Sequence, residues 1–195
     1  MIPFILYFSS TIASGNLQDS IRMEIQQPLS TLNSKINDFV ESYHVVFIGG
    51  FLNEGLVGYF SANKETLTDL GISFSELYPS SRNGILLNAA LLRDEIIKLS
   101  QEVKKPLILI AHSKGGLEAL TLVMVYKNLT LDGTIKATVL IQPGLRGSFV
   151  AEITGAFFEP SPISNWEGLQ AMRPENTQSL LNHLEKGWIH QPIKN

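Results

Sequence analysis

The sequence contains no cysteine, which excludes disulfide bonds, thiolate nucleophiles and cysteine-ligated metal sites. Histidine is also scarce. The four histidines are not at the spacing of a metal-binding motif such as HExxH, so we expect no metal and no other cofactor. Lysine and arginine together account for 15 residues and are spread along the chain without clusters. This distribution provides no track for a phosphate backbone, so we expect no nucleic-acid partner.

The chain has no apolar run of the roughly 20 residues that span a bilayer, so we expect no stable membrane span. Residues 2–8 are apolar, and residues 9–15 are small and polar. This order resembles the hydrophobic and cleavage regions of a secretory signal, but no basic residue precedes the run. The alternative is a buried β-strand that belongs to the core. A signal would indicate a secreted or periplasmic protein and a strand a cytoplasmic one, so the compartment stays open.

The composition favours one globular domain over residues 1–195, because 44% of the residues are hydrophobic and only 17% are charged. Short β-like runs alternate with longer helical patterns. This alternation predicts an α/β fold with a mostly parallel sheet and helices on both faces. The expected strands are 44–48, 72–78, 106–111 and 135–141, and the expected helices are 63–70, 84–103, 113–127 and 175–186. In the helix 84–103 we expect an apolar face that includes Leu87, Leu91, Ile96 and Leu99.

One segment between a strand and a helix carries the chemistry: it reads Ala-His-Ser-Lys-Gly-Gly over residues 111–116. A strand that turns into a helix within about four residues presents its apex residue, here Ser113, in a strained backbone conformation. The small residues Ala111 and Gly115 leave room for this crossing. Ser113 also lies at a helix N-terminus, where the Lys114 N–H would stabilise an oxyanion. The alternative is that Ser113 is an ordinary helix N-cap.

This segment is similar to the nucleophile elbow of α/β-hydrolases, in particular the lipase and esterase branch, which reads G-H-S-x-G-G or A-H-S-x-G-G. Residues 44–51 resemble the earlier strand of that fold, whose following loop supplies a second oxyanion donor. The resemblance assigns that donor to the Phe51 N–H, with Leu52 as the alternative. Residues 138–148 resemble the strand after the nucleophile helix, where lipases carry a P-x-x-G-S turn. The resemblance implies a serine hydrolase of small-molecule or lipid esters that forms an acyl-enzyme at Ser113.

A serine nucleophile needs a base and an acid, which follow it in the order Ser, Asp or Glu, His in this fold. Two histidines follow Ser113. His183 falls within a helical pattern, whereas His190 is the better candidate base; His44 and His112 are expected to be structural. The carboxylates after Ser113 are Glu118, Asp132, Glu152, Glu159, Glu167, Glu175 and Glu185. We expect Glu118 to be a packing or solvated residue and Asp132 a turn residue.

Residues 142–195 contain no clear strand, so the family pattern is expected to be shortened at its C-terminus. The chain is then either a shortened hydrolase or a complete small one with a rearranged acid and base. A second function therefore stays open: a non-catalytic protein of the same fold that lacks a complete triad and binds a ligand or partner. Missing strands would leave a sheet edge exposed, which favours an oligomer. A nucleotide-binding fold is disfavoured, because the glycines form neither G-x-G-x-x-G nor a Walker loop.

Overall fold

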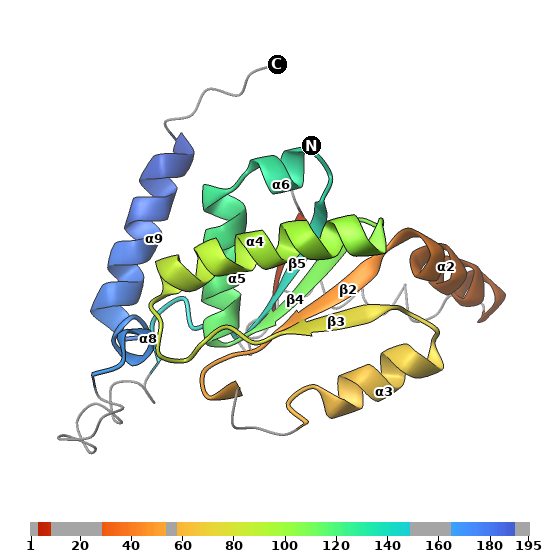
Figure 1. Cartoon of the computed structure of the whole chain (residues 1–195), viewed down its shortest axis with the longest axis horizontal. Coiled ribbons are helices and arrows are strands. Elements are labelled where there is room, and N and C mark those ends of the chain that lie inside the picture. Colours follow the sequence, from red (N-terminus) through yellow and green to blue (C-terminus); the bar gives the residue numbers. More distant parts are fainter. Residues whose placement is uncertain (1–3, 9–28, 54–57, 149–164, 190–195) are drawn as a thin grey trace, which may run out of the picture.

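A computed structural model describes residues 4–8, 29–53, 58–148 and 165–189. Five strands form one sheet in the order β1-β5-β4-β2-β3, and every neighbouring pair is parallel (Figure 1). The strands are β1 (Phe4–Phe8), β2 (His44–Ile48), β3 (Phe74–Leu77), β4 (Leu107–His112) and β5 (Ile135–Ile141). The expected α/β class with a parallel sheet is confirmed.

Helices cover both faces of this sheet, as the sequence predicts. On one face lie α4 (Ile85–Val103) and α5 (Lys114–Val125), with the short α6 (Asn128–Leu131) beside them. On the other face lie α2 (Leu29–Ser42) and α3 (Ser61–Asp69). The remaining described helices are α8 (Glu167–Gln170) and α9 (Pro174–Ile189), of which α9 packs against α5. Among the described helices, none combines the length and apolar character that crossing a membrane requires.

Strand β2 shows why two helical layers are needed, because all five of its residues are buried. Val46 and Ile48 pack with the buried side chains of α4 and α5, whereas Val45 and Phe47 pack with residues of α2 and α3 on the opposite face. Successive side chains of a strand point to opposite faces, so an unbroken apolar run is stable only when both faces are covered. The expectation of a strand buried on both faces is confirmed.

The buried face of α4 differs from the one that periodicity predicts. Leu87 and Leu91 are about half exposed, at 49% and 48%. The apolar residues that the helix buries are Ile85, Ala89, Leu92 and Ile96. The first two turns are apolar on nearly all sides, so spacing alone does not select a face. The polar residue Asn88 decides it, because its side chain is buried against Glu118 of α5.

At one edge of the sheet, β1 pairs with β5 from Phe4–Ala137 to Phe8–Ile141. The strand interpretation of residues 2–8 is therefore the one found for residues 4–8. Strand β1 is thus the edge strand of the described sheet on this side, next to β5. Residues 9–15, which resemble a signal cleavage region, lie outside the described residues.

Candidate active site

Ser113 is the single residue between the end of β4 and the start of α5. Its backbone has φ 55° and ψ −125°, and its N–H donates to the Ile141 carbonyl oxygen at 3.0 Å. A non-glycine residue with such angles costs on the order of 1–3 kcal/mol, and such costs cluster at functional sites. The Ser113 side chain makes no capping hydrogen bond to α5. The turn is therefore the sharp one that the sequence predicts, and the ordinary N-cap interpretation is wrong.

Small residues permit this turn because the first turn of α5 touches the ends of two neighbouring strands. A Cβ built on Gly115 would overlap the carbonyl oxygen of Gly49 and lie 2.9 Å from that of Ile48. A Cβ built on Gly116 would lie 2.7 Å from Pro143 Cβ, just beyond β5. Ala111 is fully buried. The Ala-x-Ser-x-Gly-Gly pattern thus reflects direct backbone contact between the helix and the carboxyl edge of the sheet.

We expect Gly115→Ala to lower ester turnover by about 100-fold, since a displacement of about 1 Å at a reaction centre has effects of that size. The added methyl group would push the loop after β2 away from Ser113. The measurement is the kcat/KM for an activated ester. Gly84→Ala is the matched control, because its Cβ would meet Glu167 at an ordinary 3.5 Å. Equal activity of the two variants would contradict the prediction.

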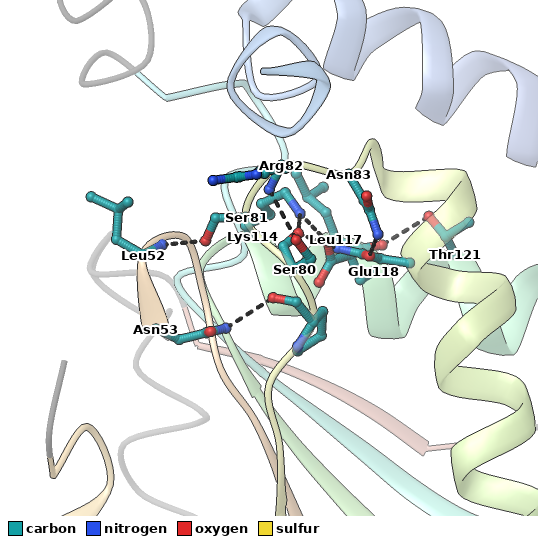
Figure 2. Close-up of polar contacts among 12 residues, drawn as sticks. Leu52, Asn53, Ser80, Ser81, Arg82, Asn83, Lys114, Leu117, Glu118 and Thr121 are labelled. Atoms are coloured by element: carbon teal, nitrogen blue, oxygen red, sulfur yellow. Dashed lines mark hydrogen bonds and ion pairs between the residues drawn. The ribbon is translucent and has the colours of Figure 1, made fainter. Parts of the chain in front are cut away.

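Two backbone N–H groups beside Ser113 have no acceptor in the part of the chain that the structure describes. Lys114 is the first residue of α5, so its N–H has no carbonyl one turn earlier. The loop after β2 brings Gly50 against Ser113, since a Cβ built on Gly50 would lie 2.9 Å from Ser113 Cβ. The Phe51 N–H follows in this loop. The alternative donor fails, because the Leu52 N–H already donates to Ser81 Oγ at 2.6 Å (Figure 2).

The side chain of Lys114 turns into the protein and forms a buried ion pair with Glu118, one helical turn along α5 (Figure 2). The two side chains are only 2% and 1% exposed. Asn88 Nδ2 also donates to Glu118 Oε1 at 2.6 Å, and Lys114 Nζ donates to the Ser80 carbonyl oxygen at 3.3 Å. Glu118 is thus buried and paired, and the expectation of a packing residue holds while that of a solvated one is wrong. The spacing of four residues was the available sequence signal.

The loop between β3 and α4 connects this ion pair to α8. A Cβ built on Gly168 would overlap the Ser81 carbonyl oxygen and lie 2.9 Å from Lys114 Cε, and the Gly168 N–H donates to the Arg82 carbonyl oxygen at 3.1 Å. The Arg82 guanidinium lies 5.2 Å from the ring centroid of Trp166, whose ring packs edge-on against Phe51. The segment before α9 therefore contacts both the Lys114 side chain and the candidate oxyanion loop.

The described histidines do not reach Ser113 through a hydrogen bond. His183 is exposed on α9. His44 lies at the opposite end of the sheet and bonds Ser73 and Ser75; burial lowers its pKa, with a further contribution from Lys105. His112 Nδ1 lies 2.5 Å from the Tyr59 hydroxyl oxygen. His190, the candidate base, lies outside the described residues.

Among the candidate acids that the structure describes, none forms a hydrogen bond with Ser113. Glu152 and Glu159 fall outside the described residues. Asp132 Oδ1 accepts the Thr134 N–H at 2.9 Å, which confirms the turn assignment. Over the described ranges, no three His, Cys, Asp or Glu side chains group together as a metal site would require. Sequence and structure thus agree that Ser113 lies between β4 and α5, whereas the candidate base and acid rest on sequence position alone.

No known family model and no curated protein matches this sequence. Solved structures do share its fold. The lipase BlEst2 of Bacillus licheniformis in its mature form is 14% identical with a TM-score of 0.60, over 74% of this chain and 61% of that one. The metagenomic carboxyl esterase MGS0156 is 22% identical with a TM-score of 0.58, over 73% and 46%. Phospholipase PlaB from Legionella pneumophila is 16% identical with a TM-score of 0.54, over 77% and 36%.

These similarities show that the chain has the α/β-hydrolase fold that lipases and esterases share. The match covers between about a third and three fifths of the length of those structures. At these identities the likeness concerns the fold. The function has to be argued from the residues around Ser113.

Proposed function

We propose that the protein hydrolyses carboxylic esters through an acyl-enzyme formed on Ser113. The observation that carries the proposal is the strained backbone of Ser113, which has φ 55° between β4 and α5. Beside it, the N–H groups of Lys114 and Phe51 have no acceptor among the described residues. A strained residue beside unpaired donors is the arrangement that acyl transfer requires. The fold is shared with a lipase, a carboxyl esterase and a phospholipase, which favours a small-molecule or lipid ester as the substrate.

The reaction has two halves. Ser113 Oγ attacks the ester carbonyl carbon while a base takes the hydroxyl proton, and the N–H groups of Lys114 and Phe51 bind the resulting oxyanion. The alkoxide departs with that proton as the alcohol, which leaves an acyl group on Ser113. Water then attacks the acyl carbon with the help of the same base, the carboxylic acid leaves, and Ser113 recovers its proton. We assign the base to His190 on its position in the sequence.

A fluorophosphonate probe tests the nucleophile, because it reacts with an activated serine and not with an ordinary one. We expect one adduct per chain, located on Ser113 by peptide mapping, and no adduct on the heat-unfolded protein. Labelling should be slowed strongly in His190→Gln and little in His183→Gln, the matched control on α9. An adduct elsewhere, or none on the folded protein, would contradict the proposal.

One observation favours the alternative function, a non-catalytic protein of this fold that binds a ligand or partner. Within the described ranges, no histidine forms a hydrogen bond with Ser113. The same labelling experiment separates the two functions. A folded protein that binds an ester without reacting with the probe or turning the ester over would support the alternative.

A further inference from the structure

Tyr59 is a partly buried polar group that the reaction outlined above does not use. It lies in the loop before α3, and its ring packs edge-on against Phe60 with centroids 4.8 Å apart. Its hydroxyl oxygen reaches the end of β4, where it lies 2.5 Å from His112 Nδ1. His112 directly precedes Ser113. The phenol is therefore hydrogen-bonded to the residue next to the candidate nucleophile, although Tyr59 and His112 are 53 positions apart in the sequence.

The Tyr59 hydroxyl and the Ser113 side chain both border the small space beside the Gly50 Cα. A Cβ built on Gly50 would lie 2.8 Å from the Tyr59 hydroxyl oxygen and 2.9 Å from Ser113 Cβ. Because both groups border this one point, a glycine is required there, and the phenol oxygen lies within reach of a group bound to Ser113. Gly50 belongs to the loop that holds the Phe51 N–H.

The contacts of the phenol oxygen decide in which direction its proton points. The backbone of Gly50 lies beside this oxygen, since a Cβ built on Gly50 would be 2.8 Å from it, and this proximity lowers the pKa of Tyr59. A phenol has one proton to donate and can accept through its oxygen. We take His112 Nδ1 as the protonated ring nitrogen, so that it donates to the phenol oxygen and the proton of Tyr59 is left for another partner. Burial raises the pKa of Tyr59 more than the Gly50 backbone lowers it, which keeps the hydroxyl protonated at neutral pH.

We infer that the Tyr59 hydroxyl is a third donor to the oxyanion formed at Ser113, held in place by His112 and Gly50. This inference rests on the proposed function. In the first half of the reaction the hydroxyl donates its hydrogen bond to the former carbonyl oxygen as negative charge develops, and no proton is transferred. The hydrogen bond that Tyr59 accepts from His112 polarises its O–H and strengthens this donation. His112 is then a positioning residue for Tyr59.

The test is Tyr59→Phe, which keeps the ring and its packing and removes only the hydroxyl. We expect kcat for an activated ester to fall about 100- to 1,000-fold, the effect of removing one oxyanion donor, with a much smaller change in KM. For the corresponding thionoester the loss should be several-fold smaller, because sulfur is a weak hydrogen-bond acceptor. Tyr43→Phe is the matched control: it precedes β2, at the opposite end of the sheet, and should retain full turnover.

A second pair of variants tests the positioning of Tyr59. The amide nitrogen of His112→Asn preserves a donor near the place of Nδ1, so this variant should retain most of the turnover, whereas His112→Leu should lose about ten-fold, the scale of one hydrogen bond. Unchanged ester turnover in Tyr59→Phe, or equal losses for ester and thionoester, would overturn the role of Tyr59 while fluorophosphonate labelling of Ser113 still upheld the proposed function. If the wild-type protein neither reacts with the probe nor turns over the ester, the proposed function and the role of Tyr59 are both wrong.

Discussion

Replacing Ser113 with glycine is expected to abolish ester turnover and to make the protein more stable. Removal of the nucleophile should lower kcat by at least about four orders of magnitude. The gain in stability follows from φ 55° and ψ −125°, which cost a serine about 1–3 kcal/mol and glycine little. Glycine also loses about 0.5–1 kcal/mol more backbone entropy on folding. The net increase in the free energy of unfolding should be about 1 kcal/mol.

Ser113→Ala is the control that separates strain from chemistry. Alanine lacks the hydroxyl but retains a Cβ, so it should lose the same turnover without the gain in stability. The Ser113 hydroxyl makes no capping hydrogen bond, so its removal should not weaken α5. The measurements are urea unfolding and ester kinetics on both variants. A glycine variant that is less stable than the alanine variant, or turnover in either, would refute the interpretation of Ser113 as a strained nucleophile.

Removing the carboxylate of Glu118 is expected to cause a large loss of stability. In Glu118→Ala the Lys114 ammonium would keep its buried position without its counter-charge. Breaking one side of a buried ion pair costs about 3–5 kcal/mol, because the remaining charge is neither solvated nor paired. Asn88 would also lose its hydrogen bond to Glu118, while it keeps those with Ser80 and Asn83. We expect this loss in the free energy of unfolding from urea denaturation at neutral pH.

Two comparisons make this prediction specific. The double variant Lys114→Met with Glu118→Leu removes both charges, and it should recover most of the stability, since apolar replacements of buried pairs are often neutral. It should also retain labelling at Ser113, because the Lys114 position keeps its backbone N–H. Glu102→Ala removes an exposed partner at the same i, i+4 spacing, from Lys98 on α4, and should change stability by about 0.5 kcal/mol or less. Equal losses in Glu118→Ala and Glu102→Ala would contradict the prediction.

The parallel sheet and the place of Ser113 could be predicted from the sequence because both depend on local patterns. Unbroken apolar runs such as residues 45–48 and 107–111 identify strands that are covered on both faces. The run of small residues around Ser113 is required by backbone contacts within one strand–turn–helix unit and at the ends of the adjacent strands. A pattern of this kind is visible in a few consecutive residues.

The surroundings of Ser113 were decided by tertiary structure, because they depend on contacts between residues far apart in the chain. The Leu52 N–H donates to Ser81 Oγ, 29 positions away, which leaves the Phe51 N–H as the candidate oxyanion donor in that loop. Asn88 turns α4 toward Glu118 across 30 positions, so that Leu87 faces outward. The spacing of residues in the sequence does not predict such pairings, because each forms only when the strands and helices pack together. The sequence by itself determined where the nucleophile position lies, and packing determined which groups surround it.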